Sequence, residues 1–200
     1  MKKSSRRKFL ERVALLAVAL ISLPVKLFAG RNGCHTGSDV AGPFHRPNAP
    51  FRDNLTLGMS VKGELIEVRG TVFGNDCKSV LAGALLEIWH SDPKGEYDMR
   101  TNDFVGHARI KTSSSGDYYF KTYIPGYYTD AGMDRPKHIH YKISATGHKT
   151  LVTQLYFKGD KRLDNDPFVN QNNGLERALP YEKNEKGVYQ LRFDIYLRTL

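Results

Sequence analysis

Residues 135–143 read Arg135-Pro136-Lys137-His138-Ile139-His140-Tyr141-Lys142-Ile143. In a β-strand, successive side chains point to opposite faces of the sheet. The two histidines and Lys142 then share one face, and the two isoleucines and the tyrosine share the other. This alternation predicts a strand with one apolar face and with two imidazoles side by side. Such a pair can occupy adjacent positions around one metal ion, but two polar residues on a solvated face produce the same pattern.

Most of the chain beyond residue 30 shows the same period of two, which is typical of β-strands. Apolar and polar residues alternate over 66–72 and 189–197, whereas 84–89 is apolar on most of both faces and is expected to be a central strand. Further strands are expected at 104–111, 118–122, 138–145 and 151–157, with irregular segments at about 30–58 and 160–186. Short strands at this spacing predict an all-β fold, a β-sandwich with irregular loops and no long helix.

The first thirty residues have a different character. Arg6-Arg7 and Lys8-Phe9-Leu10 precede an apolar run over 13–25, which is too short for a comfortable membrane span and is typical of a signal peptide. The paired arginines resemble a bacterial twin-arginine export signal. We therefore expect a signal peptide over 1–30, with an uncleaved anchor as the alternative. A single β-sandwich domain over 31–200 would then be exported to the periplasm or beyond, with no stable membrane span after cleavage.

Charge and cysteine content restrict the partners and the compartment. The net charge of +9 arises mostly from residues 1–30, because the remaining residues carry 23 basic and 20 acidic side chains, a net charge of +3. This composition gives no support for nucleic-acid binding, which needs basic residues gathered on one face. Cys34 and Cys77 are the two cysteines of the chain. An even number in an exported protein permits one disulfide, which we expect, although two free thiols are the alternative.

Chemically distinctive residues gather near the ends of four predicted strands. The four segments are 87–97, with Trp89 and Gly95-Glu96-Tyr97; 124–128, Ile124-Pro125-Gly126-Tyr127-Tyr128; 135–140; and 153–157, Thr153-Gln154-Leu155-Tyr156-Phe157. Together with Gly42-Pro43-Phe44 they resemble the intradiol ring-cleavage dioxygenases, the family of catechol and protocatechuate dioxygenases. The resemblance covers most of residues 40 to 160. Its most specific part is Arg-Pro-x-His-Ile-His followed by Thr-Gln-Leu-Tyr-Phe.

The resemblance implies a non-haem iron centre, Fe(3+), held by Tyr97, Tyr128, His138 and His140. A phenol has an ordinary pKa of about 10, but a tightly bound trivalent ion keeps it ionised. The interval between Tyr128 and His138 is shorter than in the protocatechuate enzymes, and threonine follows Tyr128 where proline is usual. Tyr127 is therefore the alternative ligand. The short interval also removes residues that would line the substrate pocket in those relatives.

The implied catalytic residues are Arg135, Tyr97 and Gln154. Arg135 would stabilise negative charge on the substrate, Tyr97 would leave the metal and accept a catechol proton, and Gln154 would add a polar contact. The implied reaction cleaves a catechol-type ring with O2 to a muconate-type diacid, and Gly42-Pro43-Phe44 would shape the mouth of the site. Two other functions remain open: a catechol-binding module without turnover, and a zinc or copper enzyme that uses the histidine pair. A homo-oligomer is compatible with each. The remaining histidines of the strands and turns, His90, His107 and His148, are expected at the surface or beside the ligands.

Overall fold

The computed structural model describes residues 34–200, and the expected export signal over 1–30 lies outside the described residues. The described part is mostly β, with one short α-helix and two 3-10 turns. The strands are β1 (Leu65–Gly74), β2 (Leu85–Trp89), β3 (His107–Lys111), β4 (Asp117–Tyr123), β5 (Tyr128–Asp130), β6 (Met133–Arg135), β7 (His138–Ser144), β8 (Leu151–Phe157), β9 (Ala178–Leu179), β10 (Glu182–Lys183), β11 (Tyr189–Arg192) and β12 (Ile195–Leu197). The helical turns are η1 (Leu163–Asn165), α2 (Pro167–Gln171) and η2 (Gly174–Arg177). Among the described residues, no helix has the length and apolar character needed to cross a membrane.

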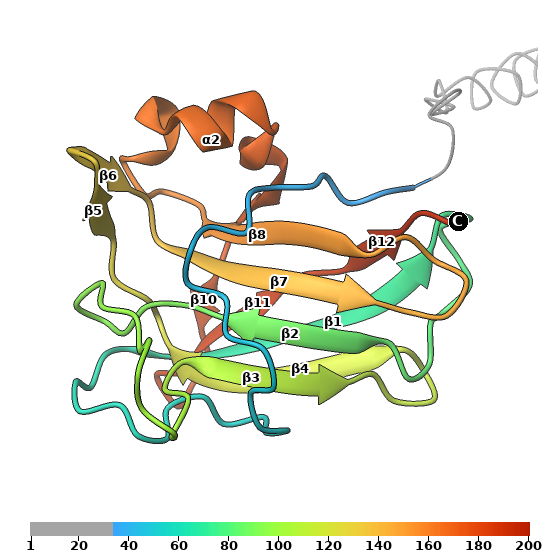
Figure 1. Ribbon diagram of the computed structural model, residues 1–200, viewed down its shortest axis with the longest axis horizontal. Helices are drawn as coiled ribbons and strands as arrows, with labels where there is room; N and C mark the ends of the chain where they lie inside the picture. The colour runs from blue at the N-terminus through green and yellow to red at the C-terminus, as the bar shows by residue number, and fades with distance from the viewer. Residues whose placement is uncertain (1–33) are drawn as a thin grey trace, which may run out of the picture. The chain divides into compact units, whose positions relative to one another are not determined.

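The strands form two mixed five-stranded sheets and a separate hairpin (Figure 1). One sheet has the order β10-β11-β1-β12, with β4 also paired to β1, and the other has the order β3-β2-β7-β8-β9. Each sheet contains both parallel and antiparallel pairs, such as β1 with β11 and β1 with β4. Strand β2 pairs with both β3 and β7, which confirms that the doubly apolar stretch is an internal strand.

Both sheets contribute side chains to one hydrophobic core. Ile139, Tyr141 and Ile143 of β7 are fully buried in it, as their alternation predicts, and Ile66 and Val68 reach it from β1. Burial of an isoleucine side chain contributes roughly 1.5–3 kcal/mol, so this face of β7 is firmly held. The opposite face of β7, which carries the two histidines, therefore points away from this core.

The expected strand over 189–197 is in fact two strands, β11 and β12. The register is the same on both sides of the break, because Arg69 pairs with Arg192 and Val72 pairs with Ile195. Between them the Asp194 carboxylate, rather than a main-chain carbonyl, accepts the hydrogen bond of the Thr71 N–H at 2.9 Å. A side chain thus interrupts the main-chain ladder without changing the alternation in the sequence.

Two other expectations need correction. The strand expected over 104–111 begins only at His107, because Phe104 and Gly106 have φ of 51° and 70°, a left-handed conformation that no strand allows. The segment expected to be irregular over 160–186 contains η1, α2, η2, β9 and β10. The short α2 begins where the Asp166 side chain accepts the Val169 N–H and where proline takes the first helical position, and both are common at helix starts.

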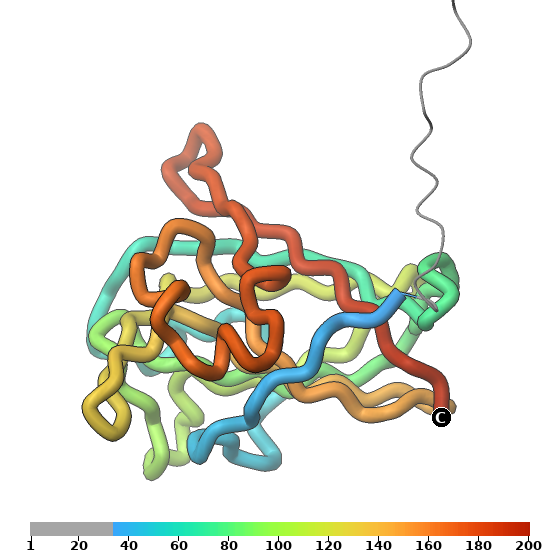
Figure 2. The backbone as a smooth tube through the Cα atoms, turned by 90° about the horizontal axis from the view of Figure 1, so that it is seen from above, coloured from blue at the N-terminus to red at the C-terminus, as the bar shows by residue number. Residues whose placement is uncertain are grey.

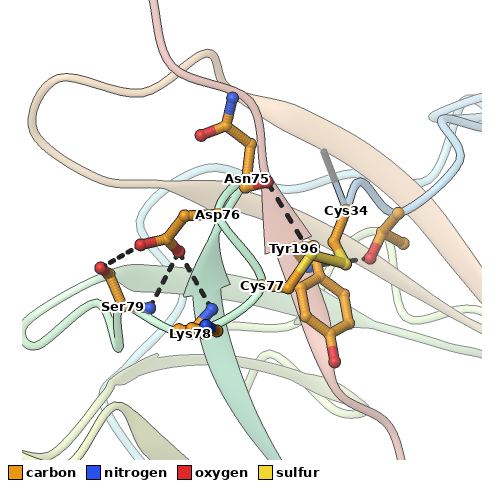
Figure 3. Close-up of a disulfide and its surroundings, with 8 residues drawn as sticks. Cys34, Asn75, Asp76, Cys77, Lys78, Ser79 and Tyr196 are labelled. Atoms are coloured by element: carbon orange, nitrogen blue, oxygen red, sulfur yellow. Dashed lines mark hydrogen bonds between the residues drawn. A yellow bond between two sulfur atoms is a disulfide. The ribbon is translucent and has the colours of Figure 1, made fainter. Parts of the chain in front are cut away.

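The start of the described chain, residues 34–46, is called here the N-terminal segment. The Cys34–Cys77 disulfide joins it to the turn after β1, which confirms the expected pairing (Figure 3). From there it crosses β8, where the Asp39 N–H donates to the Val152 carbonyl at 2.9 Å and the Gln154 amide donates to the Val40 carbonyl at 2.7 Å. Figure 2 shows this blue segment running beside the orange segment that contains α2.

Candidate metal centre

Four side chains that the sequence singles out converge at the start of β7. The Nε2 atoms of His138 and His140 are 3.0 Å apart, and the Tyr97 hydroxyl is 3.4 Å from His138 Nε2. The ring of Tyr128, at the start of β5, lies with its centroid 5.7 Å from that of His138 and 5.5 Å from that of Tyr97. Three separate parts of the chain therefore bring two imidazoles and two phenols together.

The two tyrosines are neighbours because the turn that precedes Tyr97 packs against the chain that precedes Tyr128. The Asp92 carbonyl accepts both the Gly95 N–H at 3.0 Å and the Gly126 N–H at 2.8 Å. Gly95 has a φ of 91°, and a β-carbon at this position would overlap the Tyr127 carbonyl oxygen. Only glycine permits this conformation and this close approach, so Gly95 is needed to bring the two phenols together.

The histidine pair has the geometry of two adjacent metal ligands. His138 Nδ1 lies 2.6 Å from the Pro136 carbonyl, which can only accept, so Nδ1 carries the proton and Nε2 presents a lone pair. Two nitrogen ligands about 2.1 Å from a metal and at right angles to each other are about 3 Å apart, which matches the observed separation. The Trp89 indole stacks on the His140 ring at 4.8 Å, and His140 Nδ1 has no hydrogen-bond partner among residues 34–200.

Burial keeps these four side chains uncharged in the absence of a cation. It lowers the pKa of His138 to about 4 and the pKa of His140 well below its usual range. Burial also raises the pKa of Tyr97 well above its ordinary value and raises that of Tyr128, which the nearby Arg135 partly opposes. Neutral imidazole is the form that binds metals, and buried phenols need a strong cation in order to ionise. The donor set therefore fits a hard, highly charged ion such as Fe(3+).

The two other predicted site residues lie beside this cluster. Arg135 is buried, and its Nε donates to an Asp166 carboxylate oxygen at 2.5 Å. Its Nη2 lies 3.4 Å from Gln154 Oε1, and its guanidinium covers the ring of Phe168 at 4.5 Å. Sequence reasoning missed Asp166 and Phe168, whose only local sign was the Asp-Pro start of a short helix.

The N-terminal segment supplies one wall of the cluster. The Phe44 ring stacks on the Tyr97 ring at 4.1 Å with an angle of 11° between planes, and it meets the Tyr128 ring edge-on at 5.6 Å. A β-carbon on Gly42 would lie 3.5 Å from His140 Cε1. The alternative ligand Tyr127 lies elsewhere, since its side chain is 43% exposed and the Arg162 guanidinium covers its ring.

The remaining histidines do not join the cluster. His90 is buried rather than at the surface, with Nε2 2.9 Å from the Thr122 hydroxyl and Nδ1 2.7 Å from the Ser91 carbonyl. His107 is also buried. Its Nδ1 lies 2.9 Å from the Val105 carbonyl, and its Nε2 lies 3.0 Å from the Phe44 carbonyl. Of the three, only His148 reaches the surface, as expected, and it is half-buried.

Comparison with known proteins places this arrangement in a family. A family model described as Dioxygenase matches residues 40–199. The chain is 32% identical over 185 residues to 6-chlorohydroxyquinol 1,2-dioxygenase of Cupriavidus pinatubonensis, which covers 82% of this chain and 65% of that protein. It is 33% identical over 164 residues to catechol 1,2-dioxygenase 2 of Acinetobacter lwoffii, which covers 72% of this chain and 59% of that protein. It thus spans less than two thirds of the length of either curated relative.

A solved structure gives the same result. The dioxygenase domain of a dioxygenase carbohydrate-binding protein fusion from Streptomyces sp. SirexAA-E superposes with a TM-score of 0.72 at 30% identity, covering 84% of this chain and 100% of that domain. The match of the family model covers both sheets and all of the predicted site residues. The chain belongs to the intradiol ring-cleavage dioxygenase family.

Proposed function

We propose that this protein holds iron(III) through Tyr97, Tyr128, His138 and His140 and cleaves a catechol-type ring with O2 to a muconate-type diacid. The observation that carries the proposal is the convergence of two Nε2 atoms, 3.0 Å apart, with the Tyr97 hydroxyl 3.4 Å from one of them and the Tyr128 ring alongside. Family membership supports both the metal and the reaction class. Tyr128 is the second phenolate ligand rather than Tyr127, because only its ring lies beside the histidines.

When bound, the ferric ion supplies a template and a Lewis acid that makes the catecholate reactive towards O2. The residues of the chain provide the proton acceptor and the positioning. On substrate binding, the Tyr97 oxygen would accept one of the two catechol protons, and a solvent-derived hydroxide would accept the other. The Phe44 ring stacks on the Tyr97 ring at 4.1 Å and so restricts rotation of the phenol out of its plane.

Arg135 stabilises negative charge that develops on the substrate. Its guanidinium is buried and lies close enough to Tyr128 to oppose part of the rise that burial causes in the pKa of that phenol. A fixed cation in a site with little water acts more strongly than the same charge in solution. Gln154 completes this side of the site, since its Oε1 faces the guanidinium and its amide nitrogen is bound to the Val40 carbonyl.

We also propose that the two sheets form a sandwich and that the protein functions outside the cytoplasm of a bacterium. The Cys34–Cys77 disulfide supports export, because disulfides persist in oxidising compartments. The substrate is a small catechol or hydroxyquinol-type ring, the class named for the two curated relatives.

The test is an iron-reconstituted sample in an oxygen electrode with catechol, protocatechuate and hydroxyquinol. We expect about one iron per chain, a red-brown tyrosinate absorption band, and O2 consumption that matches the diacid formed. Tyr128→Phe should remove or strongly shift the band, and the matched control Tyr127→Phe should leave it unchanged. A band change only with Tyr127→Phe would overturn the ligand assignment.

Two outcomes would support the alternatives. A colour change with catechol and no O2 consumption would indicate a binding module that does not turn its ligand over. A colourless protein that retains zinc or copper on the histidine pair would indicate a different metal enzyme.

A further inference from the structure

Asp166 is a buried carboxylate that has no role in the chemistry described so far. Its side chain is 0% exposed in the ion pair with Arg135. One oxygen, Oδ2, lies 2.5 Å from Arg135 Nε, and the other, Oδ1, accepts the Val169 N–H at 2.9 Å at the start of α2. A buried carboxylate with both oxygens in use ties two groups together rigidly. The two groups here are the guanidinium beside the metal cluster and the short helix of the 160–177 segment.

The backbone of Arg135 does not by itself fix the guanidinium. Strand β6 pairs Arg135 with Tyr128 of β5, which places the α-carbon. The arginine side chain still has four rotatable bonds, and ordering them carries an entropic cost. Among the described contacts, the Nε–Asp166 bond is the shortest that the side chain makes, while the contact of Nη2 with Gln154 is 3.4 Å long. The Phe168 ring then covers one face of the guanidinium at 4.5 Å.

We propose that Asp166 is a positioning residue, which holds the Arg135 guanidinium in the place from which it stabilises the substrate. The bond to Nε occupies one edge of the guanidinium and leaves the Nη nitrogens to face Gln154 and the substrate. Asp166 also keeps the buried cation paired when no substrate is present, which an arginine in this position requires. This inference rests on the proposed function only for the role of Arg135 in the reaction.

The first test needs no metal. In the metal-free protein, the Arg135 Nε–H is followed by 15N-resolved hydrogen exchange, and the signal is assigned by its loss in Arg135→Lys. We expect slow exchange in the wild type and at least about tenfold faster exchange in Asp166→Asn, because the carboxylate that protects this proton is lost. Asp194→Asn is the matched control, since the Asp194 carboxylate also accepts an arginine Nε–H, from Arg192 at 2.9 Å, and a main-chain N–H, from Thr71 at 2.9 Å, but lies at the other sheet. Asp194→Asn should leave the Arg135 signal unchanged.

The second test uses the iron-loaded protein. Asp166→Asn should lower kcat by about 100-fold, the size expected when a catalytic group is displaced by about 1 Å, with KM and iron content changed much less. Asp166→Glu, which keeps the carboxylate on a longer stem, should restore part of the loss. If Asp166→Asn does not fold, Asp166→Glu carries the test, with an expected kcat between those of the wild type and Arg135→Lys.

The outcomes separate this proposal from the proposed function. Wild-type exchange of the Nε–H in Asp166→Asn would overturn the positioning role whatever the enzyme does. Unchanged kcat per folded molecule, with only lower stability, would also overturn it. Absence of ring cleavage by the wild type would overturn the proposed function instead, and the exchange measurement would still decide whether Asp166 holds Arg135.

Discussion

Opening the Cys34–Cys77 disulfide should lower the stability of the protein without separating the two histidines and two tyrosines of the candidate site. The two cysteines are 43 residues apart in sequence, with α-carbons 5.2 Å apart. A cross-link that closes a loop of this length restricts the unfolded chain and contributes about 4 kcal/mol in the chain-entropy model. For a protein of this size, such a loss lowers Tm by roughly 10 °C.

The cluster should survive because the N-terminal segment has other attachments closer to it. The Thr36 N–H donates to the Tyr196 carbonyl at 3.1 Å, and Asp39 forms its buried ion pair with Arg177 at 2.6 Å. Both attachments lie between the disulfide and Phe44, the residue that stacks on Tyr97. Reduction should therefore free the first residues of the segment and leave the stacked rings in place.

The assay is guanidinium unfolding of the metal-free protein, oxidised and reduced, followed by circular dichroism. The double variant Cys34→Ser/Cys77→Ser is the control. Its unfolding free energy should match that of the reduced wild type and should not change when reductant is added. Iron uptake at 25 °C should be the same for all three samples. A difference in unfolding free energy below about 1 kcal/mol would refute the loop-entropy argument. Loss of iron binding on reduction would show that the disulfide itself holds the site together.

Three other perturbations follow from single residues. His90 is buried with its pKa lowered to about 4, so the unfolded chain takes up a proton that the folded protein does not. Between pH 6.5 and 4 this group should contribute about 3 kcal/mol to the fall in the unfolding free energy of the metal-free protein, on top of the contributions of the other buried histidines, and His90→Gln should make the fall smaller by that amount. Gly70→Ala places a β-carbon against the Phe193 carbonyl and should lower the free energy of unfolding, measured by thermal unfolding, by about 3 kcal/mol. Gly74→Ala in the same strand is the control: its new β-carbon would have its nearest neighbour 3.5 Å away, and the loss should be less than about 1 kcal/mol. Arg46→Met removes a 3.2 Å bond to the Asp98 carboxylate, next to Tyr97, and should cost about 1 kcal/mol and speed amide exchange in the following loop.

Local patterns predicted the strands wherever burial alone decides the structure. In β7 the alternation correctly assigns the core residues, because one face of this strand packs on the other sheet. The same reasoning fails near Asp194, where the apolar and polar residues still alternate. There the break arises because the Asp194 carboxylate, in place of a main-chain carbonyl, accepts the N–H of Thr71, which belongs to a strand far away in sequence. Alternation reports which way side chains point, and it carries no information about which group accepts each ladder hydrogen bond.

The candidate site was likewise predicted only where a local pattern identifies its residues. The residues predicted for it are those that a short motif carries, such as His138 and His140, which are two positions apart on one strand. Asp166 was missed because it lies 31 residues from Arg135, and an Asp-Pro pair in a polar stretch indicates only a helix start. Asp39 was missed for the same reason, since its partner Arg177 is 138 residues away. Buried ion pairs between distant segments leave no periodic trace in a sequence.

The choice between the two adjacent tyrosines shows what the hairpin adds to the motif. Neighbouring residues of an extended chain point to opposite sides, so only one of Tyr127 and Tyr128 can face the histidines. The hairpin β5–β6 decides between them, because its register pairs Tyr128 with Arg135, and the Thr129 hydroxyl donates to the Asp134 carboxylate at 2.7 Å one step along. A slip of one residue would turn Tyr127 inward and would also move the guanidinium away from Asp166. Which tyrosine faces the histidines and where the buried cation lies are therefore set by the same few hydrogen bonds, so a variant that loosens the hairpin should disturb both together.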